Sequence, residues 1–308
     1  MNLEQLKGFV AVAEVGHFTR ASEQLHLAQP SLSRQISTLE QELGAELFHR
    51  ARGNISLTAA GEALLPRARR MLTDADSIRS EMAELAGLQR GRVRLGATPT
   101  LCISLVAEVL RAFHDAHPGV ELQLVEGGSN LLIDQLGAGA VDMALVTISD
   151  GRPVAGAALM RTPLLTEELV VVSSADEPPI AESSIDMQRL SQLPLVALAE
   201  SYDLRDATDA AFRSAGLTST PVVEGAEMDA VLRFVERGIG VAVVPATVPV
   251  DRPALRAVRL SDPQLERTIV LAHRSDVNPT RAAAAMRDVI VSTASDLAAR
   301  SPETLRLV

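Results

Sequence analysis

Two residue types that support particular chemistries are nearly missing from this chain of 308 residues. Cys102 is the only cysteine, so no internal disulfide can form, which suits a reducing cytoplasm. Lys7 is the only lysine, which excludes a Schiff-base lysine from the later part of the chain. No apolar run approaches the roughly 20 residues that span a bilayer, and no secretory signal is visible. These absences predict a cytoplasmic protein without a membrane partner.

Recognisable catalytic and metal-binding patterns are missing as well. The sequence has no Gly-x-Ser-x-Gly nucleophile motif and no glycine-lysine loop that would cradle a phosphate. The histidines are scattered without ligand spacing: His17, His26, His49, His114, His117 and His273. We therefore expect no catalytic residue, no metal ligand and no cofactor, and hence a protein that is not an enzyme.

The net charge of −10 at first argues against a nucleic-acid partner. The acidity is uneven, because residues 1–90 hold 10 basic and 11 acidic residues (−1), while residues 91–308 hold 19 and 28 (−9). DNA binding by the near-neutral first part must then depend on where its arginines lie. The candidates for phosphate neutralisation are Arg34, Arg50, Arg52, Arg67, Arg69 and Arg70.

The first 58 residues follow the order helix, helix, helix, hairpin. Apolar residues at helical spacing predict helices over 3–15 and 19–25, and a third helix that begins at Pro30. The buried stripe expected for the third helix is Leu32, Ile36, Leu39 and Leu43. Short strands over 47–49 and 55–57 flank a turn whose Gly and Asn favour positive backbone angles. The order predicts a winged helix-turn-helix.

This segment resembles the DNA-binding half of LysR-type transcriptional regulators. The resemblance is carried by Phe9, Ala21, Leu25, Gln29, Pro30, Ser31, Ser33, Ile36, Leu39, Glu40, Leu43, Gly44, Leu47, Phe48, Arg50, Leu57, Thr58 and Gly61. Ser22 departs from the alanine that is frequent in the family, but serine is small enough for the same packing. The resemblance implies double-stranded DNA as the partner.

The polar face of the third helix supplies the expected DNA contacts. A helix in the major groove presents its first residues to base edges, and arginine and glutamine can form bidentate bonds there. The expected DNA-binding residues, including two on the hairpin, are Gln29, Pro30, Ser31, Ser33, Arg34, Ser37, Arg50 and Arg52. An ordinary solvated helix face is the alternative.

A long helix is predicted after Thr58, a suitable N-cap. Apolar and small residues recur at steps of three and four at Gly61, Leu64, Ala68, Met71, Ala75, Ile78, Met82 and Leu85. Such a seam needs a partner, and we expect the same helix of a second copy, although packing against the chain's own second half is an alternative. A homodimer predicts an inverted-repeat DNA site. The family resemblance adds a tetramer and RNA polymerase as a candidate contact.

Beyond residue 91 short apolar strands alternate with helices, which indicates a parallel α/β sheet. Three stretches, 93–99, 139–145 and 238–245, resemble the effector domain of LysR-type regulators, which is similar to periplasmic binding proteins. The expected fold is therefore a two-lobed α/β effector domain preceded by a mostly α winged helix-turn-helix and a linker helix. The expected ranges are 1–58 (DNA-binding), 59–88 (linker) and 89–308 (effector-binding), with lobe I at about 91–162 and 268–300 and lobe II at about 163–267.

Polar residues that follow these strands predict the effector pocket. In open α/β sheets ligands bind beyond the carboxyl ends of the strands, and free N–H groups at helix starts favour anions. By position in the family, the expected effector-binding residues are Thr98, Thr100, Ser129, Thr147 and Tyr202. Helix capping is the alternative role for each serine or threonine.

The expected function is transcriptional regulation controlled by a small effector that carries a carboxylate. A small-molecule binding protein without transcriptional output is the alternative, and it would need an export signal and no DNA-binding head. Cys102 lies near the expected pocket, but no second cysteine is available to resolve an oxidised thiol. A buried structural cysteine is therefore favoured over a redox sensor.

Overall fold

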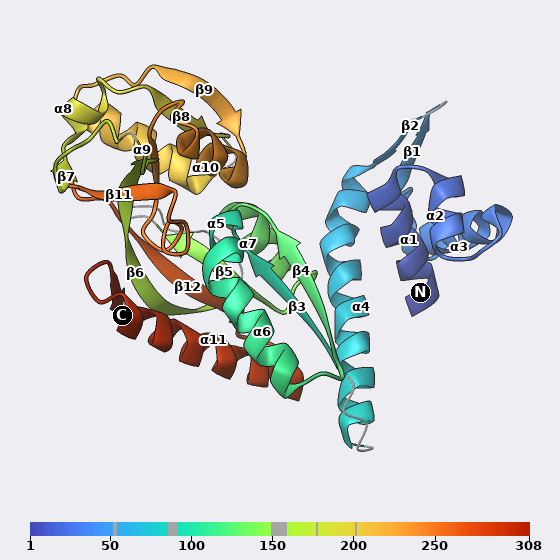
Figure 1. The fold of residues 1–308 in the computed structure, drawn as a ribbon. Coiled ribbons are helices and arrows are strands. Elements are labelled where there is room, and N and C mark those ends of the chain that lie inside the picture. The colour runs from blue at the N-terminus through green and yellow to red at the C-terminus, as the bar shows by residue number, and fades with distance from the viewer. Residues whose placement is uncertain (52–53, 86–90, 149–158, 177, 201) are drawn as a thin grey trace. The chain divides into compact units, whose positions relative to one another are not determined.

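The computed structural model describes residues 1–308 except 52–53, 86–90, 149–158, 177 and 201 (Figure 1). The described chain divides into two compact units. The first comprises Met1–Gly91 with Gln135–Val141, and the second comprises Arg92–Asp134 with Asp142–Val308. Each unit is considered by itself.

Three short helices build the core of the first unit: α1 (Leu3–Val15), α2 (Phe18–Gln24) and α3 (Gln29–Leu43). The α1 helix begins with a capping box between Asn2 and Gln5, and α3 ends at Gly44, whose φ of 67° few other residues adopt. Leu32, Ile36 and Leu39 of α3 are fully buried, as the helical spacing predicts. The expectation that Leu43 completes this stripe is wrong, because its position in the last turn leaves it 42% exposed.

A two-stranded hairpin follows, formed by β1 (Phe48–Ala51) and β2 (Asn54–Leu57). The strands are antiparallel, with Phe48 opposite Leu57. The first strand begins one residue later than expected, because Leu47 instead accepts a bond from Thr58 N and is buried in the core. The turn residues 52–53 lie outside the described part of the chain.

The helix α4 (Ala59–Leu85) completes this unit. Thr58 caps it as predicted, because its Oγ1 accepts a hydrogen bond from Gly61 N at 3.1 Å. Gly61 packs closely, since a Cβ there would lie 2.3 Å from the carbonyl oxygen of Leu47. Ala68 of the apolar seam is buried in the helix-turn-helix core, but Met71, Ile78 and Met82 are 42%, 59% and 53% exposed. These three side chains of the later part of the seam are therefore open to a partner.

The second unit contains a nine-stranded sheet in the order β4-β3-β5-β12-β6-β11-β7, with β10 and β13 also paired to β6. The strands are β3 (Gly91–Ala97), β4 (Val120–Glu126), β5 (Met143–Ile148), β6 (Leu159–Ser174), β7 (Ser184–Ile185), β10 (Ala242–Pro245), β11 (Leu255–Leu260), β12 (Glu266–Arg274) and β13 (Leu305–Leu307). The expected parallel pairing is found in only part of this sheet, which is mixed. β3 and β5 are parallel, but β12 is antiparallel to both β5 and β6. The chain leaves lobe I along β6 and returns to it along β12, so these neighbouring strands point in opposite directions.

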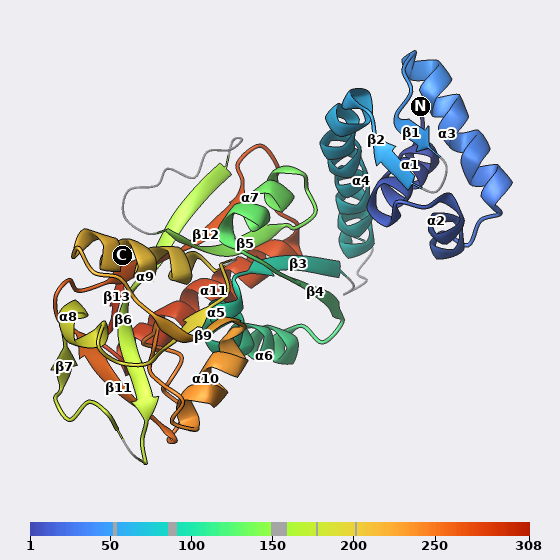
Figure 2. The same ribbon diagram turned by 90° about the horizontal axis from the view of Figure 1, so that it is seen from above.

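Two lobes share the long strand β6, which Figures 1 and 2 show passing from one lobe to the other. Up to Glu168 its partners are β12 and β13, and from Leu169 they are β10 and β11. Lobe I is the part built on the first half of β6, and lobe II the part built on the second half. Each has its own apolar core, centred on residues such as Phe113 and Met286 in lobe I and Val171 and Leu232 in lobe II.

Helices cover the sheet in both lobes. In lobe I they are α5 (Pro99–Leu101), the π-helix η1 (Cys102–Val106), α6 (Ala107–Ala116), α7 (Ser129–Gly137) and α11 (Arg281–Arg300). In lobe II they are α8 (Met187–Leu190), α9 (Asp203–Ser214) and α10 (Met228–Glu236), beside the parallel pair β8 (Leu195–Leu198) and β9 (Pro221–Ala226). Residues 99–116 thus form three consecutive helical pieces. Both α7 and α9 begin at the edge where the two lobes face each other.

Candidate functional site

The amino-terminal end of α3 presents the polar face predicted from sequence. Gln29, Pro30, Ser31 and Arg34 are exposed, while Ser33 is half-buried. The Arg34 guanidinium makes no ion pair with any described residue, so its donors are open to a partner. The Arg34 carbonyl accepts a bond from Thr38 Oγ1 at 2.9 Å, which is a common pairing within a helix.

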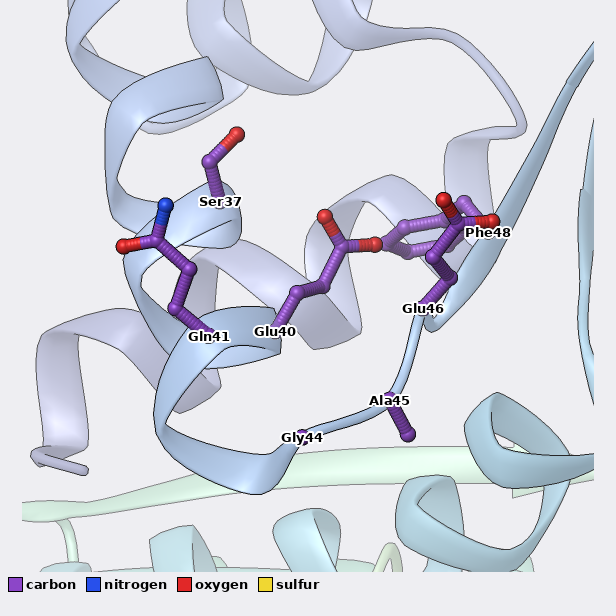
Figure 3. A pocket seen from close by; sticks show the side chains of 7 residues that line it. All are labelled: Ser37, Glu40, Gln41, Gly44, Ala45, Glu46 and Phe48. Carbon is purple, nitrogen blue, oxygen red and sulfur yellow. The ribbon is translucent and has the colours of Figure 1, made fainter.

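The carboxyl-terminal end of the same helix has a different character (Figure 3). An open hollow of about 710 Å³ is lined by Ser37, Glu40, Gln41, Gly44, Ala45, Glu46 and Phe48. Glu40 Oε1 accepts a hydrogen bond from Leu47 N at 2.9 Å, which ties the helix end to the hairpin. Ser37 lies one turn beyond Arg34 on α3 and lines this hollow together with the carboxylates of Glu40 and Glu46, which would repel DNA phosphates.

The arginines expected to contact phosphate are placed unevenly. Arg69 Nη2 pairs with Glu14 at 2.8 Å, and Arg67 Nη1 donates to the carbonyl of Ala63. Arg50 lies on β1 opposite Ile55, but its side chain, like the whole of Arg52, lies outside the described part of the structure. Arg34, the one basic residue of α3, is exposed and makes no ion pair with a described residue.

A second candidate site lies between the lobes of the second unit. A cavity of about 20 Å³ is lined by Thr98, Pro99, Thr100, Gly128, Thr147, Tyr202, Asp203, Leu204 and Arg267. Four of the five residues expected to bind an effector are among these, and the fifth, Ser129, contacts Thr147 through two hydrogen bonds. The structure brings all five together from segments that are far apart in sequence.

Strand ends and helix starts position these groups. Thr98 follows β3 and precedes Pro99, the first residue of α5. Thr147 lies near the end of β5, and its backbone N–H donates to Ser129 Oγ at 3.1 Å, at the start of α7. Such an edge is where α/β sheets bind ligands.

Asp203 is a site residue that the sequence did not reveal. It begins α9 in lobe II, and its Oδ2 accepts hydrogen bonds from Ser129 Oγ at 2.5 Å and from Thr147 Oγ1 at 3.2 Å, both in lobe I. Ser129 N lies 3.4 Å from the same oxygen. One carboxylate oxygen of lobe II therefore faces three donors of lobe I, and the only available signal was an acidic residue in the first turn of a predicted helix.

A buried ion pair at the strand crossover also escaped prediction. Arg267 Nε and Nη2 donate to Glu167 Oε2 at 2.9 and 2.8 Å, and Arg267 Nη1 donates to Thr100 Oγ1 at 2.7 Å. The other Glu167 oxygen accepts from Thr247 N at 2.9 Å. Glu167 is completely buried and Arg267 is 6% exposed, so each charge depends on the other. The network links Thr100, which lines the cavity, to the crossing strands β6 and β12.

Tyr202 contributes its ring to the cavity, but its hydroxyl is engaged within lobe II. The hydroxyl donates to Glu227 Oε2 at 2.6 Å and accepts from Met228 N at 3.3 Å. Burial and the hydrogen bond to Glu227 raise the pKa of the phenol well above its ordinary value. Tyr202 is thus a neutral wall of the cavity at physiological pH.

Cys102 is half-buried on η1, close to this edge. Burial, followed by the charge of Glu126, raises the pKa of its thiol to about 12. The reactive species of cysteine is the thiolate, so the thiol is held in its unreactive form at neutral pH.

The described residues contain no group of three or more side chains arranged to hold a metal ion. No helix in the described ranges is long and apolar enough to cross a membrane.

Two family models match this chain. The model of the LysR substrate binding domain matches residues 86–295, and that of bacterial regulatory helix-turn-helix proteins of the lysR family matches residues 3–62. The HTH-type transcriptional regulator IlvR of Caulobacter vibrioides is 32% identical over 283 residues, which cover 91% of this chain and 95% of that protein.

Solved structures extend the similarity to the whole fold. A full-length OxyR variant from Pseudomonas aeruginosa is 28% identical with a TM-score of 0.71, and the match covers 96% of this chain and 94% of that one. CbnR in complex with its target DNA is 24% identical with a TM-score of 0.66, covering 96% and 99%. The latter likeness concerns the fold alone.

Proposed function

Since the chain belongs to the LysR family of transcriptional regulators, we propose that the first turns of α3 read its operator DNA. The exposed side chains of Gln29 and Arg34 are suited to bidentate bonds with adenine and guanine in the major groove. Ser31 and Ser33 lie beside them, and Arg50 and Arg52 belong to the hairpin that would approach the backbone or the minor groove. Residues 1–58 form the DNA-binding domain in this proposal.

The linker of residues 59–88 joins two copies in the proposed assembly. The exposed apolar residues Met71, Ile78 and Met82 of α4 support this role, because a second α4 would cover them. Two reading heads related by a twofold axis require an inverted-repeat operator. A pair of such dimers, and a contact with RNA polymerase at the promoter, extend the proposal.

The effector of the proposed regulator is a small carboxylate that binds between the lobes of residues 89–308, without any further cofactor. The observation that carries this assignment is the convergence of donors from Ser129, Thr147 and Thr98 on one edge. The start of α7 adds the partial positive charge of a helix amino terminus, which stabilises anions. A carboxylate is the common metabolite group that accepts several such bonds at one position.

Selection of operator fragments tests the proposal. Purified protein is incubated with sheared genomic DNA, and the retained fragments are sequenced and then titrated with a panel of small carboxylates. We expect an enriched inverted repeat whose affinity for the protein changes with at least one carboxylate. Retention of random fragments only, or an enriched site that responds solely to uncharged or cationic compounds, would contradict it.

A further inference from the structure

The carboxylate subsite of lobe I is already filled by the chain itself. Ser129 Oγ accepts from Thr147 N and donates to Asp203 Oδ2, so its hydroxyl is used in both directions. Thr147 Oγ1 gives a second hydrogen bond to the same oxygen. These donors therefore form with the Asp203 carboxylate the hydrogen bonds that we expect them to form with the carboxylate of a bound metabolite.

The absence of a countercharge distinguishes Asp203 from the buried Glu167. Glu167 has Arg267 as its partner, whereas Asp203 makes no ion pair among the described residues. Its charge is stabilised by the neutral donors of lobe I and by the amino terminus of its own helix α9. The contact with lobe I is thus exchangeable for water or for another anion.

A separate observation shows that the subsite is incomplete. Thr98 is only 5% exposed and lines the same cavity, yet its Oγ1 has no hydrogen-bond partner among the described residues. Buried hydroxyls are almost always paired, because an unpaired one has lost its water without compensation. Asp203 accepts hydrogen bonds from Ser129 and Thr147 on one side of the cavity. The hydroxyl of Thr98 stays available for a hydrogen bond with a larger ligand.

The size of the cavity excludes a metabolite while Asp203 is in place. A space of about 20 Å³ holds a single water molecule, whereas pockets for small ligands measure roughly 300–1,000 Å³. The lobes must therefore separate before an effector enters, and separation breaks the Asp203 bonds.

We infer that Asp203 is an internal ligand of the effector pocket, which holds the lobes together without effector and is replaced by the effector carboxylate. The inference rests on the proposed carboxylate site. It adds that the Asp203 side chain competes with the effector carboxylate for that site. Effector affinity is then lowered by the free energy of the internal contact, and effector binding changes the spacing of the lobes by expelling Asp203.

Chemical rescue of Asp203→Ala by acetate tests this inference in the full-length chain. The variant leaves the donors of Ser129 and Thr147 without their acceptor, so added acetate should bind there and stabilise the protein. At ten times its dissociation constant, bound acetate should raise the Tm by roughly 3–6 °C, as the linkage relation and the size of the domain indicate. Wild type should show only the small, non-saturating shift that an equal concentration of chloride gives.

Three matched variants control for other effects. Asp206→Ala removes a carboxylate one turn along the same helix and should respond like wild type. Asp203→Asn keeps an acceptor oxygen in the subsite and should fold even if the alanine variant does not. It should bind the carboxylate effector more tightly than wild type does, and acetate should not stabilise it. Asp203→Ala combined with Ser129→Ala should lose the acetate response.

The outcomes separate the inference from the proposed function. An Asp203→Ala protein with no more response to acetate than Asp206→Ala, or an Asp203→Asn protein with unchanged effector affinity, overturns the internal ligand. If wild-type operator binding still responds to a carboxylate and Ser129→Ala abolishes that response, the carboxylate cleft stands without it. A response that persists in Ser129→Ala contradicts the proposed cleft itself.

Discussion

Arg34 is the residue on which the proposed recognition of the DNA sequence depends most. Its guanidinium is exposed on the first turns of α3 and has no ion pair among the described residues, so the proposed contact with DNA would break no ion pair. Arg34→Ala should lose about 1–3 kcal/mol of discrimination between operator and random duplex, because a bidentate bond to a base disappears. Fluorescence anisotropy with both duplexes measures the ratio.

Arg20→Ala provides the control for Arg34, since it removes an equal charge from an exposed position on α2. We expect it to leave the operator-to-random ratio nearly unchanged. Equal ratios for wild type and Arg34→Ala would remove Arg34 from base readout.

The buried pair of Glu167 and Arg267 should carry a large share of the stability of the crossover. Arg267→Met leaves the Glu167 carboxylate buried without its cation and should cost about 3–5 kcal/mol of unfolding free energy. Adding Glu167→Gln should recover part of this loss, because it removes the stranded charge. Urea unfolding followed by circular dichroism measures both.

Arg306→Met is the comparison for that experiment. Its pair with Glu266 is exposed, and solvent screens such pairs, so the unfolding midpoint should scarcely move. Similar losses for Arg267→Met and Arg306→Met would show that the crossover pair has no special role.

Cys102 should react slowly in the folded protein. With a pKa of about 12, roughly one thiol in ten thousand is ionised at pH 8, against about a quarter for an ordinary cysteine of pKa near 8.5. Iodoacetamide labelling should therefore be far slower than in the urea-unfolded chain, and should speed up as pH rises towards 12. Rapid labelling of folded protein at pH 8, or peroxide-sensitive operator binding that Cys102→Ser abolishes, would instead indicate a redox sensor.

At the scale of elements, α4 carries the prediction about assembly. Ile78→Glu places a carboxylate in the proposed seam and should weaken the dimer by roughly 10- to 100-fold, because a buried unpaired charge is costly. Ile78→Leu keeps the seam apolar and should leave the dimer intact. Sedimentation velocity over a range of concentrations distinguishes the two, and equal association by both variants would place the interface elsewhere.

Local patterns predicted the elements whose burial is decided by their own residues. The spacing of Leu32, Ile36 and Leu39 identified the buried face of α3, and Thr58 identified the start of α4. The strand direction in the second unit was not accessible in this way, because β12 pairs with strands that lie about a hundred residues or more earlier. The short strands β7 and β13 have too few residues to show any period.

At the scale of the whole molecule, the sequence predicted a DNA-binding module joined to a two-lobed domain, and the family match confirms this arrangement. The match of residues 3–62 to a regulatory helix-turn-helix argues against the alternative of a small-molecule binding protein without transcriptional output. The five hydroxyl-bearing site residues were expected from strand ends and from the resemblance. Asp203 and Arg267 were not, because their partners lie 74 and 100 residues away in sequence and only the fold brings them together.

The coupling between the cleft and the DNA is the central claim, and one titration tests it directly. Operator affinity is measured against increasing concentrations of the carboxylate selected from the panel, for wild type and for Ser129→Ala. The account predicts a saturable change in affinity for wild type and an affinity for Ser129→Ala that does not vary with carboxylate concentration. An identical response in both proteins would contradict it.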